Sequence, residues 1–278
     1  MDGQGIELVN VTKIYKNAGT EKTALKDITL TIQPGEYVGL MGMNGSGKST
    51  LARLCNGLIK PTRGKVYVDG MDTSCPENTT EIRRLVGMVF QNPDNQLICP
   101  IVEEDIAFGP ENLGLSITEI NRRVAWALQA VGLEELKHHA PHLLSGGQKQ
   151  KVALASVLAM LPDYLILDEP TSMLAPLSRW ELMEHLRTLN TQKGMTIILS
   201  SHNPEDLIHA NRLIVLDQGS IYLQGTPREV YAQEAALAAI GLEPPGIYQI
   251  INQLVKQGHN IADNIKTIPE LVDLICQE

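Results

Sequence analysis

The sequence predicts an α/β fold with an antiparallel β portion, an inserted helical subdomain and a small C-terminal helical domain. Two short apolar runs, YVGLMG (37–42) and YLILDE (164–169), have the length of buried parallel strands. Alternating apolar and polar residues near the N-terminus favour antiparallel strands. Helical periodicity dominates the middle and the end of the chain.

The first part of the chain reads as strands and turns around one helix. Two segments, IELVNVTKIY and ALKDITLTI, alternate in hydropathy, and the tight turn QPGE follows them. Pro61 and Gly64 stop a helix that opens at Lys48. The expected elements are strands at 6–15, 24–32 and 37–42, a helix at 48–58, and strands at 64–70 and 85–93.

The middle of the chain changes to a helical pattern. From about Ile101 to His138 the periodicity is helical, and Ser116 with Glu119 forms a capping box before an amphipathic run. We expect a helical subdomain at about 94–160, inserted into the α/β core. The core then resumes with YLILDE, a helix at 177–190 and strands at 195–201 and 212–219.

The tail is expected to form a helical accessory domain at 226–278. TPRE (226–229) is a capping box with proline at the first helical position. TIPE (267–270) repeats the device before LVDLI, and LEPPG (242–246) is a hinge-like break between them.

Composition and charge exclude several classes of function. The chain has 278 residues, a net charge of −9 and a pI of about 5.3, so nucleic acid is not an expected partner. No apolar run approaches the ~18 residues that a membrane helix needs, and MDGQGIELVN has no signal-peptide pattern. Work at a membrane would therefore go through other subunits. Four cysteines show no metal-ligand spacing and are expected to be the reduced thiols of a cytosolic protein: Cys55, Cys75, Cys99 and Cys276.

The stretch GMNGSGKS (42–49) fits the phosphate-binding pattern G-x-x-x-x-G-K-[ST] between an apolar strand and a helix. Its glycines let backbone N–H groups converge on phosphate oxygens, and the helix N-terminus adds its positive dipole end. Lys48 is expected to reach the β- and γ-phosphates of a nucleotide, and Ser49 to hold Mg²⁺. An ordinary glycine-rich turn is the alternative, but it does not account for the strand–loop–helix context. The candidate phosphate-binding residues are Gly42, Asn44, Gly45, Ser46, Gly47, Lys48, Ser49 and Thr50.

Two adjacent carboxylates, Asp168 and Glu169, end the run YLILDE. Acids at the end of a buried strand are costly unless a cation or a reacting group uses them. We expect Asp168 to serve Mg²⁺ through a water molecule. Strand alternation turns Glu169 to the other side, where it would act as general base toward the attacking water. The alternative is that one acid caps the next element through Thr171 or Ser172.

A second anion-binding pattern, LSGGQ (144–148), opens another helix. Its backbone N–H groups and helix dipole would bind a second phosphate group. One nucleotide needs one phosphate loop, so the second pattern suggests that two chains share their nucleotides. A flexible helix entry is the alternative interpretation of the two glycines. The candidate residues are Ser145, Gly146, Gly147 and Gln148.

In this order and spacing, GMNGSGKS, LSGGQ and YLILDEP resemble the motifs of ATP-binding-cassette (ABC) ATPases, over about residues 6–225. The resemblance implies ATP as ligand and 1–225 as the nucleotide-binding domain. It implies that Tyr15 stacks on adenine, that Gln91 contacts Mg²⁺ and senses the transporter, and that His202 contacts the γ-phosphate. The alternatives are that Tyr15 only packs on a strand, that Gln91 is a polar residue at a strand end, and that His202 is the neighbour of a helix N-cap. The candidate catalytic residues are then Glu169, His202, Gln91 and Lys48, and the candidate metal ligands are Ser49, Gln91 and Asp168.

A narrower resemblance follows Gln91. The stretch QNPDNQLICPIVEEDIAFGPENLGL is similar to the ATPases of energy-coupling-factor (ECF) transporters, which take up vitamins and metals such as cobalt and nickel. Their C-terminal extension, which helps to hold two copies together, matches the helical tail. The resemblance implies a second ABC ATPase chain, a transmembrane coupling subunit and a substrate-binding membrane subunit. It places this chain peripherally on the cytoplasmic face of the membrane.

Five residues outside the nucleotide-binding motifs bear on the docking and coupling of the chain. Glu103, Glu104 and Asp105 are interpreted as an acidic patch for the coupling subunit, as first-turn acids that favour a helix N-terminus, or as both. Lys151 stands where many ABC relatives carry arginine, so it keeps the charge and loses the planar fork. Ala175 stands where the family usually has aspartate, in a loop that crosses the dimer interface and helps to couple the two ATP sites.

Three other functions stay open on sequence alone. The first is the ATPase of a different ABC importer, and the second is a non-transport ABC ATPase of DNA repair or chromosome organisation. The third is a regulatory subunit with little catalysis, which Ala175 keeps open although Glu169 and His202 argue against it. The transported substrate, the identity of the partner cassette and the origin of Ala175, natural or introduced, do not follow from the sequence.

Overall fold

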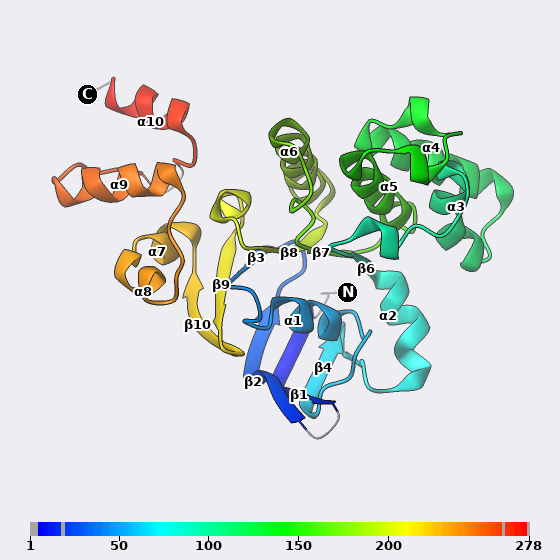
Figure 1. The fold of residues 1–278 in the computed structure, drawn as a ribbon, viewed down its shortest axis with the longest axis horizontal. Coiled ribbons are helices and arrows are strands. Elements are labelled where there is room, and N and C mark those ends of the chain that lie inside the picture. The colour runs from blue at the N-terminus through cyan, green and yellow to red at the C-terminus, as the bar shows by residue number, and fades with distance from the viewer. Residues whose placement is uncertain (1–4, 18–19, 263–264, 277–278) are drawn as a thin grey trace.

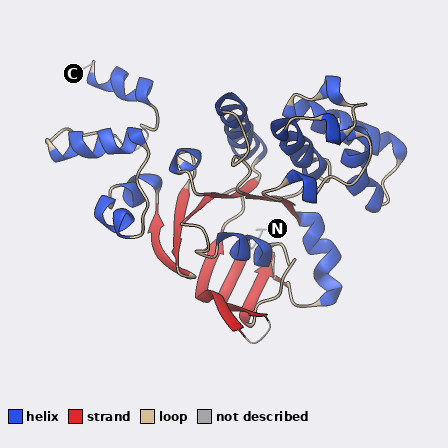
Figure 2. Ribbon diagram, in the orientation of Figure 1, coloured by secondary structure: helices blue, strands red, loops and turns tan. Residues whose placement is uncertain are grey.

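The computed structural model describes residues 5–17, 20–262 and 265–276, and it contains two β-sheets with helices around them (Figures 1 and 2). The smaller sheet is antiparallel, with the strand order β2-β1-β4-β5. Its longest strands pair as a hairpin, in which Ile6 lies opposite Ile32 and Tyr15 opposite Lys22. Its strands are β1 (Ile6–Asn17), β2 (Thr20–Ile32), β4 (Arg63–Val68) and β5 (Met71–Asp72).

The larger sheet has the order β10-β9-β3-β8-β7-β6 and carries the candidate site at the ends of its central strands. All its neighbours pair in parallel except β10 and β9, which are antiparallel. Its strands are β3 (Tyr37–Met41), β6 (Val86–Val89), β7 (Tyr164–Asp168), β8 (Thr196–Ser201), β9 (Arg212–Asp217) and β10 (Ser220–Gly225).

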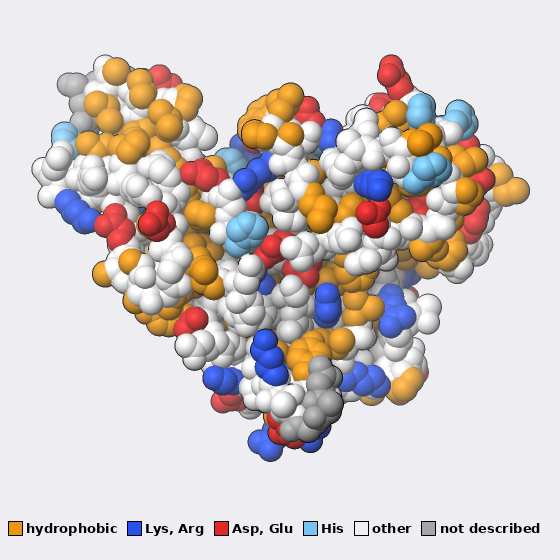
Figure 3. All heavy atoms as spheres, in the orientation of Figure 1, with side chains coloured by type: hydrophobic (Ala, Val, Ile, Leu, Met, Phe, Trp, Pro, Cys, Tyr) orange, Lys and Arg blue, Asp and Glu red, His pale blue; other side chains and the backbone are white. Residues whose placement is uncertain are grey.

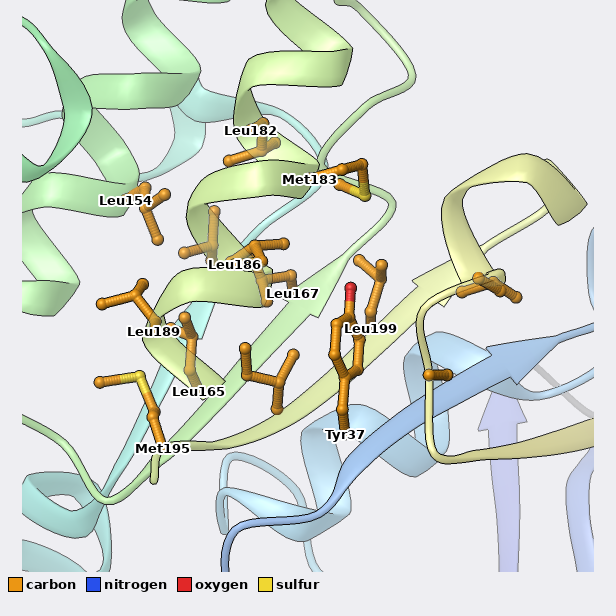
Figure 4. Close-up of a cluster of buried hydrophobic side chains, with 14 of the residues drawn as sticks. Tyr37, Leu154, Leu165, Leu167, Leu182, Met183, Leu186, Leu189, Met195 and Leu199 are labelled. Atoms are coloured by element: carbon orange, nitrogen blue, oxygen red, sulfur yellow. The ribbon is translucent and has the colours of Figure 1, made fainter. Parts of the chain in front are cut away.

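Strand alternation divides the core into two apolar clusters. Leu165 and Leu167 of β7 belong to one cluster and Ile166 to the other, because successive side chains of a strand point to opposite faces. Helix α6 (Pro176–Lys193) covers the first face with residues such as Leu186 (Figure 4). Helix α1 (Lys48–Cys55) packs on the second face, where Leu51 is fully buried. Both faces of the sheet are thus covered, as a parallel sheet requires.

The inserted helical part lies beside the larger sheet, at the upper right of Figure 1. It contains α3 (Val102–Asn112), α4 (Ile117–Val131) and α5 (Gly146–Leu158), which pack on one another. The short helix α2 (Thr79–Leu85) precedes it. Single turns of 3-10 helix complete the connections: η1 (Pro76–Asn78), η2 (Pro93–Asn95), η3 (Glu134–Leu136), η4 (Pro141–Leu143) and, after β8, η5 (Pro204–Leu207).

The C-terminal helices form a lobe on the other side of the molecule (Figure 1). They are α7 (Pro227–Tyr231), α8 (Glu234–Ala239), α9 (Gly246–Lys256) and α10 (Ile268–Ile275). Their buried residues, among them Tyr231 and Ile251, belong to the same apolar cluster as Leu207 and Leu213 of the core. The lobe therefore shares its core with the larger sheet and its helices. In the described part of the chain no helix is long and apolar enough to cross a membrane.

The predicted fold class is confirmed, and two of the three predicted capping boxes form in full. Thr226 with Glu229 and Thr267 with Glu270 exchange both capping hydrogen bonds. At α4 the Ser116 hydroxyl accepts from the N–H of Glu119, but the Glu119 carboxylate accepts from two arginines instead of reaching back. Helix α1 ends at Cys55, before the expected end at 58. The sequence did not predict α2, β5 or β10, and the domain limits 1–225 and 226–278 stay predictions.

Candidate active site

The loop GMNGSGKS joins β3 to α1, and two of its glycines are required by their surroundings. Gly42 has φ 153°, and a Cβ there would lie 2.4 Å from the carbonyl oxygen of Leu216. Gly47, the N-cap of α1, has φ 116°, and a Cβ would lie 2.8 Å from the carbonyl oxygen of Ala24. Both conformations strain any other residue, and both positions lack room for a side chain. The loop therefore presents bare backbone at the N-terminus of α1, where N–H groups and the helix dipole favour an anion.

The Lys48 ammonium lies at the centre of this loop. It is 4% exposed and donates to the carbonyl oxygens of Gly42, at 2.7 Å, and Met43, at 3.3 Å. Its Nζ also lies 3.3 Å from Oε1 of Glu169, which is 8% exposed. A buried cation whose partners are two carbonyls and one carboxylate is well placed to exchange part of this set for phosphate oxygens.

Asp168 lies at the end of β7 and is held by two hydroxyl groups. Ser49 Oγ donates to its Oδ1 at 2.9 Å, and Ser200 Oγ donates to the same oxygen at 2.7 Å. Ser200 is the register partner of Asp168 across the β7–β8 pair, so the parallel sheet itself brings it there. Ser49 and Asp168, two predicted metal ligands, are thus in direct contact.

Glu169 is the meeting point of the other predicted catalytic residues. Its Oε2 accepts from Nε2 of Gln91 at 3.3 Å and lies 3.1 Å from Nδ1 of His202, while Oε1 faces Lys48. Three residues far apart in sequence, Lys48, Gln91 and His202, therefore converge on one carboxylate. Strand alternation, which the sequence predicts to direct Glu169 away from Asp168, does not do so. β7 ends at Asp168, and Glu169 has φ 49°, so a left-handed turn rather than strand alternation separates the two acids.

A cavity of about 230 Å³ opens beside these residues. Tyr15 lies at its edge, with its hydroxyl 3.5 Å from that of Thr50. Sequence reasoning missed Lys22 and Ala24, which line the cavity from β2. The register of the hairpin, which pairs Tyr15 with Lys22, is the signal that could have found them. The cavity is lined by Tyr15, Lys22, Ala24, Asn44, Gly45, Gly47, Lys48, Ser49, Thr50, Gln91 and Glu169.

The LSGGQ residues lie at a different cavity, of about 730 Å³, which shares no lining residue with the first. Ser145 is the N-cap of α5, and the helix begins at Gly146, inside the LSGGQ pattern. Ser145 and Gln148 form a complete capping box, in which the Gln148 N–H donates to the Ser145 hydroxyl at 3.3 Å. Ser145, Gly147 and Gln148 line this second cavity, and Gly146 is exposed next to them. The two predicted anion-binding loops of one chain are therefore parts of separate surfaces.

Two glutamines of the helical part hold the backbone just before Gln91. The N–H of Phe90 donates to Gln96 Oε1 at 3.1 Å, and the carbonyl of Phe90 accepts from Gln150 Nε2 at 3.4 Å. Gln150 is 2% exposed and belongs to α5, the helix that LSGGQ opens. Gln91 is therefore anchored to the same helix that carries the second anion-binding loop.

The acidic stretch at the start of α3 does not act as one patch. Asp105 is 4% exposed, and its Oδ1 accepts from the N–H groups of Ile98 and Cys99 at 2.7 and 2.9 Å. The docking hypothesis is therefore wrong for Asp105, which holds its own loop. Glu103 pairs with Lys137 and His138, which lower the pKa of its carboxyl group. Glu104 is exposed.

The two departures from the family pattern have clear local roles. Lys151 pairs with Glu181 at 2.7 Å, so its charge ties α5 to α6. Ala175 is the N-cap of α6, and its methyl group cannot accept a hydrogen bond from the first turn. Asparagine, aspartate, serine and threonine are the residues that fit such a position best. With alanine at this position, α6 therefore begins without a side-chain cap.

Comparison with known proteins gives one consistent result. A model of the ABC transporter family matches residues 25–172. The "energy-coupling factor transporter ATP-binding protein EcfA1" of Caldanaerobacter subterraneus is 47% identical over 273 residues, which cover 98% of this chain and 99% of that protein. The protein of the same name from Clostridium perfringens is 49% identical over 265 residues, covering 95% and 94%.

Solved structures agree with these relatives. The structure of cbiO1 from Clostridium perfringens, described as part of the ABC transporter complex cbiONQ, has a TM-score of 0.75. It is 37% identical and covers 90% of this chain and 99% of that one. A dimeric ATP-binding cassette in a post-hydrolysis state, bound to ADP and phosphate, has a TM-score of 0.73 and is 34% identical, covering 80% and 98%.

Proposed function

Because the chain belongs to the ABC transporter family, and within it to the energy-coupling factor transporter ATP-binding proteins, we propose that it hydrolyses ATP to drive an ECF-type importer. Such importers take up vitamins or transition-metal ions. The observation that carries the proposal is the convergence of Lys48, Gln91 and His202 on the carboxylate of Glu169 beside the phosphate-binding loop. A regulatory subunit without catalysis would not need this arrangement.

ATP is the substrate, and each group of the site has a separate task. Loop N–H groups and Lys48 bind the β- and γ-phosphates. This binding breaks the ion pair between Lys48 and Glu169. The freed carboxylate then accepts a proton from water as the water oxygen attacks the γ-phosphorus. The bond from that phosphorus to the β–γ bridging oxygen breaks, and ADP and phosphate leave. His202 lies next to Glu169, where it would donate a hydrogen bond to the γ-phosphate, and Tyr15 would stack on adenine.

The residues around Ser49 fit Mg²⁺. A hydroxyl, a carboxylate and the amide oxygen of Gln91 are hard oxygen donors, the type that this ion prefers. In the described chain no three His, Cys, Asp or Glu side chains form a metal site by themselves. This agrees with an ion that is bound by few protein groups together with substrate phosphates. We propose Ser49, Gln91 and Asp168 as its ligands; bound there, Mg²⁺ would neutralise charge on the phosphates.

A complete ATP site is proposed to need two chains. Each chain would contribute its phosphate loop to one site and its LSGGQ loop to the other, which fits the separate cavities of the two loops. The partner is a second ABC ATPase, either identical or paralogous. The C-terminal lobe offers a surface for this association, because apolar side chains gather on it (upper left of Figure 3). The exposed apolar residues there are Ile250, Val255, Ile268, Val272 and Ile275.

The remaining partners are proposed to lie in the membrane. A transmembrane coupling subunit would contact the segment after Gln91, which exposes Ile98, Glu104 and Phe108. A substrate-binding membrane subunit would complete the complex and choose the cargo. The chain would then work at the cytoplasmic face of the membrane as a peripheral subunit.

Purification of the intact complex from membranes tests this proposal. The expected result is a particle in which two ABC ATPase chains and two kinds of membrane subunit are identified, with ATP hydrolysis by the particle. Recovery of the chain as an active ATPase without any membrane protein would contradict the transporter function. Recovery with a different set of membrane subunits would indicate another ABC importer.

A further inference from the structure

A buried carboxylate that the hydrolysis scheme does not use lies behind the candidate active site. Asp206 belongs to the turn η5, is 3% exposed and accepts from three side chains. Thr171 Oγ1 and Ser201 Oγ each donate to its Oδ2 at 2.7 Å. Arg179 Nε donates to its Oδ1 at 2.5 Å. A buried carboxylate is costly unless it is paired and hydrogen-bonded, and this one is both.

The three donors come from three segments of the site. Thr171 is two residues after Glu169, and Ser201 directly precedes His202. Arg179 is in the first turns of α6, the helix that begins after Ala175. The Asp206 carboxylate thus joins the segment after Glu169, the segment before His202 and the start of α6. A shift of Asp206 would be transmitted to all three.

The C-terminal lobe contacts the same turn through two hydrogen bonds, which are called the outer contacts here. Tyr231 of α7 donates through its hydroxyl to the carbonyl of Pro204 at 3.0 Å. Gly246, at the start of α9, donates through its N–H to Oε1 of Glu205 at 3.1 Å. Pro204, Glu205 and Asp206 are in one short turn, so η5 contacts both the C-terminal lobe and the segments of the active site. Pro204 and Glu205 of the turn also line a cavity of about 440 Å³, together with Met43, Asn44, His202 and residues 241–246.

We propose that η5 is a mechanical junction through which the C-terminal lobe sets the rate of ATP hydrolysis. Asp206 is its inner positioning residue, because it fixes the segments of Glu169 and His202 through Thr171 and Ser201. Tyr231 and Gly246 are its outer contacts, which tie the position of the turn to that of the lobe. The proposal rests on the ATPase function proposed above and adds the route by which events at the lobe reach the hydrolytic carboxylate.

The test uses the outer contacts, because neither Tyr231 nor Glu205 lines the cavity beside Lys48 and Glu169. Tyr231→Phe removes only the hydroxyl that holds Pro204. Glu205→Met removes the acceptor for Gly246, whereas the matched Glu205→Gln keeps it. In the full-length chain, Tyr231→Phe and Glu205→Met should each lower kcat about fivefold and leave KM for ATP within about twofold, as expected for the loss of one hydrogen bond felt only during the reaction. Glu205→Gln should restore the wild-type kcat.

A double-variant cycle then tests the route. Ser201→Ala removes one inner contact, and combining it with Tyr231→Phe should lower kcat by less than the product of the two single effects, because both act on one junction. Multiplicative effects would overturn the proposal. So would an unchanged kcat in either Tyr231→Phe or Glu205→Met, or parallel changes of kcat and KM. Thermal unfolding of each variant identifies any loss of folded protein.

The ATPase proposal can fail separately. An inactive wild-type chain in the intact complex with its partner chain, or full turnover in Glu169→Gln, would overturn that proposal and the junction with it. Wild-type turnover in the junction variants, together with an inactive Glu169→Gln, would overturn the junction alone.

Discussion

At the scale of single residues, the sequence predicts those groups whose chemistry requires a fixed residue type. Gly42 and Gly47 can be predicted from the sequence because their backbone conformations and crowded surroundings admit no other residue. Ser200 and Asp206 were missed. Serine and aspartate have many roles, and the partners that give these two their meaning, Asp168 and Arg179, lie far away in sequence. Three-dimensional pairing, rather than local pattern, determines such residues.

The role of Glu169 leads to the sharpest prediction at this scale. Glu169→Gln keeps the size and a hydrogen-bonding oxygen but cannot take a proton from water. We expect turnover to fall by 10²-fold or more, in line with the usual contribution of a general base of about 10²–10⁴-fold. ATP binding should persist, so the variant should accumulate as an ATP-bound closed dimer, seen as a shift in size-exclusion chromatography. Glu77→Gln, an exposed change elsewhere, is the control. Near-normal turnover in Glu169→Gln would refute the assigned base.

At the scale of elements, the sequence predicts the helices that have a capping motif or a long helical period. It misses the short helices and strands. The capping boxes at 226–229 and 267–270 form as expected, whereas the equally local one at 116–119 stays incomplete because Arg122 and Arg123 bind the Glu119 carboxylate. Helix α2 has seven residues and buries only Ile82 and Leu85, which is too few for a recognisable helical period. Strand β10 is an edge strand with only partly buried and exposed residues, so it lacks the apolar run that marked its neighbours.

The loop before α3 gives a prediction for stability. Asp105→Ala leaves the N–H groups of Ile98 and Cys99 without their acceptor, so it should lower the free energy of unfolding by about 2–4 kcal/mol. Asp105→Asn keeps one acceptor oxygen and should lose less. Glu104→Ala, on the exposed neighbour, should stay within about 0.5 kcal/mol of wild type. Denaturant unfolding monitored by circular dichroism measures all three, and equal losses at 104 and 105 would contradict the assignment.

The start of α6 gives a prediction in which stability and coupling can be separated. Both Ala175→Asp and Ala175→Asn supply a side-chain oxygen at the N-cap, so each should stabilise the chain by about 1 kcal/mol. If the family's aspartate also couples the two ATP sites, Ala175→Asp should raise ATPase activity, or tighten its link to transport, beyond Ala175→Asn. Equal activity in the two variants would reduce this position to a helix cap. Thermal unfolding and ATPase assays on the same preparations make the comparison.

At the scale of the whole molecule, the C-terminal lobe is part of the folded body rather than an appended module. The sequence predicts its helices and the break at 242–246. It does not show that Tyr231 and Ile251 share one apolar cluster with Leu207 of the core. Contacts of this kind depend on how the lobe returns to the body, which periodicity within the lobe does not reveal.

The seam between lobe and body predicts a pH dependence. Burial, followed by the nearby charges of Lys266 and Arg187, lowers the pKa of His209, against the opposing effect of Glu184 and Glu270. As pH falls below about 6.5, the unfolded chain takes up a proton at this position before the folded chain does, so the stability present at neutral pH is lost.

The measurement is the melting temperature at pH 7.5 and pH 5.5. His209→Gln should show a smaller fall between the two values than wild type. His259→Gln, at an exposed histidine in the same lobe, should behave as wild type. A fall in His209→Gln as large as that of wild type would remove His209 as the cause.

The separation of the two anion-binding loops has a consequence for concentration. In the proposed two-chain site, a chain whose LSGGQ loop opens on a surface distinct from its own phosphate loop completes a site by meeting another chain. For a partner that is an identical chain, the activity in dilute solution should therefore grow with the square of the protein concentration and become proportional to it once pairs dominate. Two chains that are held side by side on a membrane complex no longer have to find each other by diffusion. The turnover per chain then no longer depends on the protein concentration.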